Sequence, residues 1–387
     1  MTKDLILLGS TGSIGDTTLK IINKNNNKYK IKLLTTNKQI KKIYQQALKY
    51  NVKKVVIFDK NNYKKYSLKF KNKKIKVYFN VKEALQDERK KINFGISAIS
   101  GIDGMEPTLN IIKHVKNLGI ANKESIICGW KFISKELKKY NTKFIPLDSE
   151  HFSIWSLLQS ENKNQVKKIY LTASGGPFLN KPLNKLKNVS AKQAMKHPNW
   201  KMGKKISIDS ATMMNKVFEI IEAKKIFNLS YKKLSILTHP KSYVHAIIKL
   251  KNGLTKIVAH DTNMRIPIFN SLYSSNNFIN SKKLNLKILN NLSFKEINYK
   301  RFSVIKILNK LPENSSLFET ILVSINDKLV ELFLANKIKF TDISKKMHNI
   351  LDLKEFKKYK MIKPRKIYDI IFLNNKIRGK IEFKNKV

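Results

Sequence analysis

Two acidic residues lie close together in LDSEH (147–151), directly after the apolar run 143–147. In an extended segment, residues two positions apart point to the same side, so Asp148 and Glu150 are expected to share a face. In α/β proteins, ligand sites form at the carboxyl ends of the strands. Carboxylate oxygens suit hard or borderline cations such as Mg²⁺ or Mn²⁺. The pair is therefore a candidate metal site, and the alternative is two solvated acids.

A second polar group lies on the segment 209–227, which the sequence predicts to be one helix with Ser210 near its N-terminus. At about 100° per residue, Asn215, Lys216 and Glu219 share about a quarter turn of that helix. An amide, an ammonium and a carboxylate on one face can hold a phosphate and a metal side by side. A surface ion pair between Lys216 and Glu219 accounts for the same spacing equally well.

Two loops carry further polar groups. TASGGPF (172–178) places Ser174 beside two glycines, in a turn whose hydroxyl and amide groups can bind an anion. HPNWKMG (197–203) places His197 and Trp200 on a polar loop that ends at Gly203. A tryptophan in such a loop is either a core residue or a hinged cover over a site.

A glycine turn, GSTGSIG (9–15), follows an apolar strand and precedes a helix. Glycines there permit a tight turn and let the backbone approach a pyrophosphate at the helix N-terminus. The spacing is G-x-x-G-x-x-G instead of G-x-G-x-x-G, but the strand–turn–helix context favours a dinucleotide site over a bare turn. After the second strand, the chain offers Asn37, Lys38 and Gln39 and no carboxylate. A lysine there suits a 2′-phosphate, which favours NADP(H), although the chain is rich in lysine throughout.

The elements that position these residues predict an α/β fold. Residues 5–35 are typical of a strand, glycine turn, helix and second strand, and further apolar runs lie at 52–58, 75–79, 94–100 and 143–147, with a helix across 106–118. Short apolar runs that alternate with helical periodicity are typical of a doubly wound parallel sheet. We assign 1–147 to a Rossmann-like NADPH-binding domain on this pattern.

The rest of the chain has a different pattern. Apolar strands at 167–174, 234–240, 243–250 and 255–260 indicate an α+β domain over 148–285, and we assign it as the catalytic domain because it contains the candidate metal and substrate residues. Residues 286–312 carry no clear signal and are assigned to a linker. Helical stretches near 316–336, 341–358 and 364–384, the last with Pro364 at its start, predict a C-terminal helical domain over 313–387.

Composition narrows the class of protein. The 78 basic and 27 acidic residues give a net charge of +51, but arginine occurs at only five positions and the lysines are scattered, which favours lysine-rich drift over a specific nucleic-acid partner. Cys128 is the only cysteine, so an internal disulfide and a cysteine-based zinc cluster are excluded and a cytoplasmic location is expected. No apolar run approaches the length of a membrane span, and because the first strand begins near Met1, no signal peptide is expected.

Several of these strings occur together in one known family. GSTGSIG, ANKES (121–125), LDSEH, SGGPF (174–178), HPNWKMGKKISIDSATMMNK (197–216) and the later HP-KS-VH and MRIP blocks resemble 1-deoxy-D-xylulose 5-phosphate reductoisomerase, in order along the chain. The resemblance implies conversion of that sugar phosphate to 2-C-methyl-D-erythritol 4-phosphate by skeletal rearrangement and then hydride reduction. It also implies NADPH and a divalent metal, Mg²⁺ or Mn²⁺, as cofactors, and a homodimer.

The resemblance assigns roles residue by residue. It implies metal ligands at Asp148, Glu150 and Glu219, of which the two glutamates are catalytic together with Lys123. It implies substrate contacts from Lys123, Ser149, Glu150, Ser174, His197, Trp200, Ser210, Asn215, Lys216 and Glu219, with Met264 joining Trp200 as a cover. It implies NADPH contacts from Thr11, Gly12, Ser13, Ile14, Asn37, Lys38, Gln39, Asn122, Glu124 and Gly203.

Two departures from the family pattern stand out. Asn37 replaces the family's glycine and Gln39 its asparagine, which leaves fine cofactor discrimination open, and SINDK (324–328) replaces an NAANE-like block. Two other functions compete. A semialdehyde dehydrogenase on the same fold needs a nucleophilic cysteine, but Cys128 lacks a clear activating context. A polyanion-binding protein that exploits the +51 charge needs lysines gathered on one face.

Overall fold

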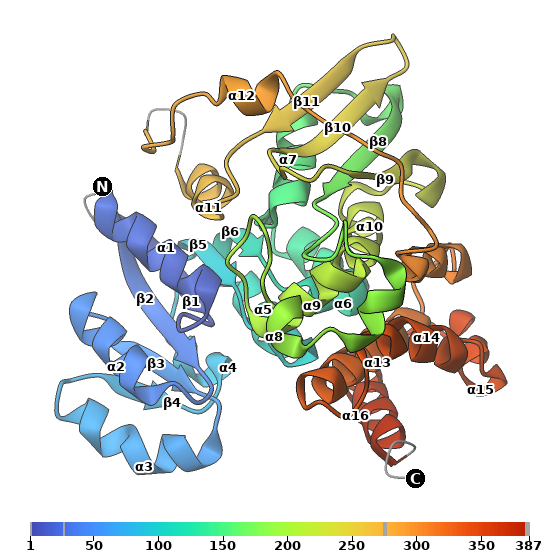
Figure 1. Cartoon of the computed structure of the whole chain (residues 1–387). Helices are drawn as coiled ribbons and strands as arrows, with labels where there is room; N and C mark the ends of the chain where they lie inside the picture. Colours follow the sequence, from blue (N-terminus) through green and yellow to red (C-terminus); the bar gives the residue numbers. More distant parts are fainter. Residues whose placement is uncertain (1, 26–27, 274–276, 384–387) are drawn as a thin grey trace. The chain divides into compact units, whose positions relative to one another are not determined.

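Figure 1 shows a computed structural model that describes residues 2–25, 28–273 and 277–383, with residues 382 and 383 described by backbone only. The chain forms two compact units. The first comprises 1–125, 129–152 and 264–279, and the second comprises 126–128, 153–263 and 280–387. The predicted division at residues 147, 285 and 312 remains a prediction.

The first unit contains a parallel seven-stranded sheet with the order β4-β3-β2-β1-β5-β6-β7 (Figure 1). Its strands are β1 (Lys3–Leu8), β2 (Tyr29–Thr36), β3 (Lys54–Ile57), β4 (Lys76–Tyr78), β5 (Ile92–Ser97), β6 (Val115–Ile120) and β7 (Lys143–Pro146). Strand order reverses between β1 and β5, so a topological switch point lies at the carboxyl end of β1. Residues 5–8 of β1 are fully buried, as expected for a strand covered on both faces. The predicted doubly wound sheet is confirmed.

The helices that connect these strands are α1 (Ser13–Lys24), α2 (Ile40–Lys49), α3 (Lys60–Lys71), α4 (Val81–Ala84), α5 (Met105–Ile112) and α6 (Lys123–Lys139), with a 3₁₀ turn at Ile102–Gly104. A later helix, α11 (Arg265–Leu272), also belongs to this unit. The predicted helix across 106–118 is wrong beyond Ile112, because 115–120 form β6 between β5 and β7. Apolar residues of α5 and β6 are both fully buried, so no polar face marks the change from helical to strand periodicity.

The second unit is built on a four-stranded mixed sheet with the order β11-β10-β8-β9. The strands are β8 (Val166–Ala173), β9 (Leu234–Thr238), β10 (Val244–Leu250) and β11 (Thr255–Ala259), close to the predicted ranges. Strands β8 and β9 are parallel, whereas β10 is antiparallel to both β8 and β11. One hydrophobic cluster includes Ile154 of α7 (Ser149–Leu157), Ile220 of α10 (Met214–Phe227) and Ile169 of β8. Helices α7 and α10 therefore share one core.

The remaining helices of this unit lie between β8 and β9 and after β11 along the chain. They are α8 (Ala191–Ala194), α9 (Lys204–Thr212), α12 (Leu286–Leu289), α13 (Phe318–Leu334), α14 (Phe340–Leu351), α15 (Lys354–Lys357) and α16 (Ile367–Phe383), with 3₁₀ turns at Lys163–Gln165, Leu183–Asn188, Tyr231–Lys233, Ser303–Lys310 and Lys358–Lys360. Among the described residues, no helix is both long and apolar enough to cross a membrane.

Three helix predictions in this unit need correction. The single helix over 209–227 is wrong: Met213 has φ +69°, which ends α9, and its successor α10 begins with the Met214 N–H donating to the Thr212 hydroxyl at 3.3 Å. The helix over 341–358 is wrong as well, because α14 stops at Leu351 and α15 is separate. Pro364 precedes α16 by three residues instead of lying in its first turn.

Candidate active site

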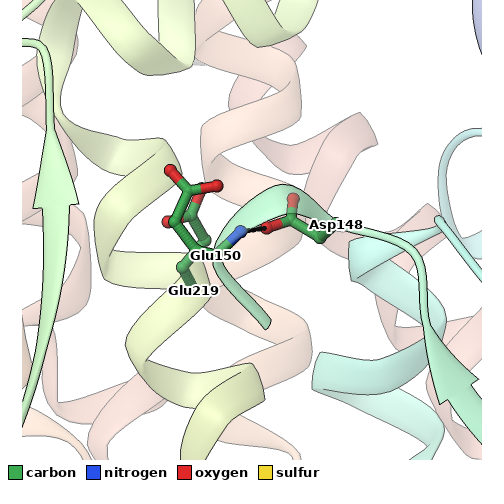
Figure 2. A group of neighbouring side chains, drawn as sticks. All are labelled: Asp148, Glu150 and Glu219. Carbon is green, nitrogen blue, oxygen red and sulfur yellow. Dashed lines mark hydrogen bonds between the residues drawn. The ribbon is translucent and has the colours of Figure 1, made fainter. Parts of the chain in front are cut away.

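Three carboxylates meet around one point (Figure 2). Asp148, Glu150 and Glu219 each offer one oxygen, and these oxygens lie within 4.8 Å of one another. Oxygens on opposite sides of a Mg²⁺ or Ca²⁺ ion are about 4 to 5 Å apart, since each lies 2.0 to 2.6 Å from the metal. The donor set and its spacing therefore fit one hard divalent cation with little rearrangement.

The start of helix α7 brings Asp148 and Glu150 together. The predicted extended segment is wrong, because α7 begins at Ser149 and Glu150 lies in its first turn. The Glu150 N–H donates to Asp148 Oδ1 at 3.2 Å, so Asp148 accepts a hydrogen bond from an amide at the helix N-terminus, where negative charge is favoured. Farther along α7, Ile154 enters the same hydrophobic cluster as Ile220, the neighbour of Glu219. That shared core explains how residues far apart in sequence meet.

Positive charges flank the carboxylates. Lys216 forms an ion pair with Glu219, and Asn215 donates a hydrogen bond to the same carboxylate. The side chains of Lys216 and Glu219 are 4 % and 1 % exposed, which rules out a surface pair. Lys123 donates to Asp148 Oδ2 at 2.5 Å. Because buried charges are costly without partners, this lysine–carboxylate arrangement indicates a built site.

The side chains beside this group extend it. Ser149 donates its hydroxyl to Glu150. His151, which is almost fully buried, places Nδ1 3.5 Å from Asp148 Oδ1. Sequence reasoning did not single out His151, although its position in LDSEH, three residues after Asp148 and therefore one helical turn away, was a usable signal.

The Ser174 loop lies against the end of α9. Gly176 has φ +67°, and a Cβ built there would lie 2.9 Å from Ala211 Cα and 3.0 Å from Ser210 O. Only glycine permits this approach, because every other residue would force the two backbones apart. The loop that carries Ser174 is thereby packed beside Ser210, in the same unit as Asn215 and Lys216 of the following helix.

His197 is held in one protonation form by its loop. Its Nδ1 accepts the N–H groups of Asn199 at 3.1 Å and Trp200 at 3.0 Å, so Nδ1 carries no proton. The hydrogen of the neutral ring is then on Nε2, which lies 2.9 Å from Ser174 Oγ and donates to it. Ser174 Oγ also accepts from the Gly176 N–H at 3.0 Å, which leaves its own hydrogen available to an anion. Ser174 therefore offers a hydroxyl donor to a negative ligand, and His197 positions that hydroxyl.

The loop at 197–203 contains the candidate cover. Trp200 is half-buried, and its ring contacts that of His245 edge-on at 6.0 Å between centroids. Gly203 is the N-cap of α9. Met264 is the N-cap of α11 in the first unit.

The glycine turn lies at the carboxyl end of β1, beside the switch point. Gly9 has φ +76°, and a Cβ there would lie 2.6 Å from Ala98 O, so the turn requires glycine. Helix α1 begins at Ser13 with Gly12 as its N-cap and no side-chain cap. The first amides of α1 therefore remain available to an anion. Thr11 lies beside the end of β2, with its hydroxyl 3.0 Å from that of Thr36.

Further candidate cofactor residues of the first unit lie on the same edge of its sheet. Asn37, Lys38 and Gln39 are exposed immediately after β2. Asn122 caps α6, the helix after β6, by accepting the Ser125 N–H at 2.7 Å, and it donates to Gly101 O at 2.8 Å. Glu124 is buried in the first turn of α6. These residues form the rim expected for a dinucleotide in a doubly wound sheet.

Comparisons with known proteins agree along the whole chain. Three models of 1-deoxy-D-xylulose 5-phosphate reductoisomerase domains match residues 5–129, 144–227 and 261–380. A reductoisomerase from Pelagibacter ubique is 57 % identical over 382 residues, 98 % of each chain, and one from a Wolbachia of Drosophila simulans is 40 % identical over 88 % of each.

Solved structures give the same result. A DOX-P reductoisomerase in complex with NADPH, fosmidomycin and magnesium superposes with a TM-score of 0.90 at 32 % identity, over 99 % of this chain and 98 % of that one. The Zymomonas mobilis enzyme in complex with NADPH gives 0.87 at 28 % identity, over 100 % and 99 %. The chain belongs to the 1-deoxy-D-xylulose 5-phosphate reductoisomerase family.

Proposed function

We propose that this chain converts 1-deoxy-D-xylulose 5-phosphate to 2-C-methyl-D-erythritol 4-phosphate, using NADPH and a divalent cation, Mg²⁺ or Mn²⁺. The relatives carry the name of this activity, and the titles of solved relatives name NADPH and magnesium. The observation in this chain that carries the proposal is the group of three carboxylates within 4.8 Å. Neither a plain dehydrogenase nor a polyanion-binding protein needs such a group.

Asp148, Glu150 and Glu219 would hold the cation. A divalent cation there supplies a Lewis acid that polarises a carbonyl oxygen of the substrate. Lys123 adds a positive charge beside Asp148, where negative charge develops on substrate oxygens. Ser149 orients the Glu150 carboxylate through its hydrogen bond, which keeps one oxygen in a fixed direction. Lys123, Glu150 and Glu219 are thus the proposed catalytic residues.

A second group of side chains would bind the phosphate end of the substrate. Ser174 presents a hydroxyl donor that His197 positions, Ser210 lies beside the Ser174 loop, and Lys216 supplies a buried positive charge. Asn215 donates a hydrogen bond to Glu219, which links the side chains proposed to bind the phosphate to those proposed to bind the metal. Binding energy gathered at the phosphate can drive closure of Trp200 and Met264 over the reacting carbons.

NADPH would lie along the carboxyl edge of the first unit's sheet. The pyrophosphate would lie against the turn and the start of α1, at Thr11, Gly12, Ser13 and Ile14. Backbone N–H groups at a helix N-terminus bind anions. Lys38 would bind the 2′-phosphate as an exposed point charge. The other proposed contacts are Asn37, Gln39, Asn122, Glu124 and Gly203.

We also propose a homodimer in the cytoplasm. The edge strand β11 leaves Ile257 47 % exposed, and Leu254 in the preceding turn is 57 % exposed. Exposed apolar side chains on an edge strand favour pairing with another chain. Light scattering coupled to size-exclusion chromatography should give about twice the 44.9 kDa of one chain. A monomeric mass at micromolar concentration would remove the dimer proposal.

One assay tests the proposed reaction. Purified protein is mixed with 1-deoxy-D-xylulose 5-phosphate, NADPH and Mg²⁺ or Mn²⁺, and absorbance at the nicotinamide band is followed while the product is identified by mass spectrometry. Oxidation should require substrate and metal, and should be slower with NADH. Turnover that survives complete removal of divalent metal would favour a dehydrogenase without a metal centre, and absence of turnover under all conditions would reject the proposal.

A further inference from the structure

Gln46 of helix α2 makes hydrogen bonds to the glycine turn and to the start of α1. This side chain is buried, and all of its hydrogen-bonding atoms contact the turn or α1. Its Oε1 accepts the Ser10 hydroxyl at 2.8 Å, while its Nε2 donates to Ser10 O and to Asp16 Oδ1, both at 3.0 Å. Three contacts from one amide fix both a backbone carbonyl of the turn and a carboxylate in the first turn of α1.

Lys42, one helical turn earlier on α2, makes a parallel set of contacts. Its ammonium donates to Thr11 O at 2.9 Å and to Asp16 Oδ2 at 2.5 Å. The Gly12 N–H, at the other end of the peptide that Thr11 O begins, donates to Gly9 O at 3.1 Å. That planar peptide is therefore held at both ends, which fixes its orientation.

These contacts decide which way the turn's amides face. Because the peptide is planar and trans, a carbonyl held toward α2 turns the N–H of the same peptide to the opposite side. The Ser10 carbonyl bonded to Gln46 thus directs the Thr11 N–H away from α2. No side chain caps the start of α1, so α2 supplies an external constraint on the turn that precedes it.

The contacts of Lys42 and Gln46 with Asp16 also have an electrostatic role. Its carboxylate stabilises the N-terminus of α1, but it also puts a negative charge next to a turn built to receive an anion. Lys42 and Gln46 together bond both of its oxygens. The charge of Asp16 is thereby compensated before a pyrophosphate arrives.

We propose that Lys42 and Gln46 are positioning residues of the dinucleotide site: Gln46 orients the Thr11 N–H toward a pyrophosphate, Lys42 holds the Thr11–Gly12 peptide in place, and both compensate Asp16. The inference rests on the proposed binding of NADPH at this turn. Neither residue is expected to touch the substrate or the metal. Their effect should therefore fall on cofactor affinity and not on the chemical step.

The chain offers matched controls beside each residue. Gln45 and Lys41 lie on the same helix, are exposed, and neighbour Gln46 and Lys42 in sequence. The test compares Gln46→Leu with Gln45→Leu, and Lys42→Met with Lys41→Met. Dissociation constants for NADPH and NADH are measured from the fluorescence of the bound nicotinamide, without substrate and without metal, and steady-state constants are measured separately.

We expect Gln46→Leu and Lys42→Met to weaken NADPH binding about tenfold, which corresponds to about 1.4 kcal/mol. NADH should weaken by the same factor, because both cofactors contain the pyrophosphate. The KM for substrate and the kcat at saturating NADPH should stay within about twofold of wild type, as should all constants of the two control variants. Gln46→Glu keeps the shape and loses the amide donor, so it replaces Gln46→Leu if the latter unfolds early.

Two results would overturn the inference. The first is NADPH affinity in the Gln46 variants equal to that of Gln45→Leu. The second is a loss confined to NADPH in Lys42→Met, which would place that ammonium on the 2′-phosphate instead of behind the turn. Wild-type protein that binds neither cofactor would instead reject the proposed function itself, so the two failures are distinguishable.

Discussion

The glycine turn and the carboxylate group offer different kinds of binding groups to a charged ligand. The turn uses backbone amides within one contiguous motif, and its side chains serve mainly to hold that backbone. The carboxylate group uses side chains from two segments, at 148–150 and at 219, which meet around one point. The first region depends on backbone conformation and the second on the assembly of a core.

This difference predicts how each region responds to mutation. A buried carboxylate that ligates a metal cannot be replaced without losing a charge, because no other group occupies its place. The turn depends on several amides, so a single change in its support weakens binding without removing the ligand groups. Losses at the carboxylate group should therefore be near-complete, whereas losses at the turn should be graded.

The largest effect is expected for Glu219→Gln. Glu219 is 1 % exposed and lies with Asp148 and Glu150 in the carboxylate group. The glutamine amide of the variant therefore removes one of three negative charges. We expect kcat to fall by at least about 10³-fold, the loss typical of removing a principal electrostatic group, while the NADPH dissociation constant stays unchanged. Mn²⁺ binding followed by electron paramagnetic resonance should weaken in parallel.

An exposed acid provides the control for this change. Glu313 pairs with Lys224 on the surface and its side chain is 69 % exposed, so Glu313→Gln should leave Mn²⁺ binding, kcat and NADPH binding intact. Near-normal turnover in Glu219→Gln would contradict its role as a metal ligand. Parallel loss of NADPH affinity would show that the two regions are not independent.

A smaller but clear effect is expected for Gly9→Ala in the turn. The residue has φ +76°, and the added Cβ would lie 2.6 Å from Ala98 O, so the backbone must shift. We expect NADPH to bind about a hundredfold more weakly, about 2.7 kcal/mol, while Mn²⁺ affinity is retained. Gly253→Ala is the matched control, because Gly253 also has positive φ, +91°, but its Cβ would meet nothing within 4 Å. NADPH affinity equal in both variants would show that the close approach to Ala98 is irrelevant.

Gly176→Ala tests a backbone element that supports the side-chain region. Its Cβ would lie 2.9 Å from Ala211 Cα, which forces the Ser174 loop away from Ser210. The KM for substrate should rise about tenfold, about 1.4 kcal/mol, with kcat less affected and NADPH binding unchanged. An unchanged KM would show that Ser174 and Ser210 do not bind the phosphate, and the proposed phosphate site would then exclude them.

The sequence predicted the turn better than the carboxylate group for the same physical reason. The strand, turn and helix around Gly9 are contiguous, so local periodicity located them and the structure confirmed the sheet. For Asp148 and Glu150, the local pattern identified the pair but gave the wrong conformation, an extended segment in place of the start of α7. The meeting with Glu219 depends on a shared core of α7 and α10, which no local pattern contains.

Errors in the helices have a related origin. The break at Met213 separates α9 from α10 inside an apolar, helix-compatible run, and its left-handed backbone arises at a methionine, a residue type that gives no signal for positive φ. Residues 115–120 form a strand because they pair between β5 and β7, a tertiary choice that overrides the helical pattern. His151, Lys42 and Gln46 were missed because their significance lies in contacts across the fold.

The smallest effect is expected for Lys38→Ala, which tests the side-chain part of the cofactor region. Lys38 is exposed after β2, so its charge acts through solvent and can contribute only modestly to binding of a 2′-phosphate. We expect NADPH to weaken about fivefold at low salt and NADH to remain unchanged, with the difference between wild type and variant shrinking as ionic strength rises. Lys41→Ala, at an exposed position of α2, is the control for loss of one positive charge. Equal weakening of both cofactors by Lys38→Ala would mean that this lysine supports the turn and does not bind the 2′-phosphate. The side chains that support the turn would then include one that follows β2.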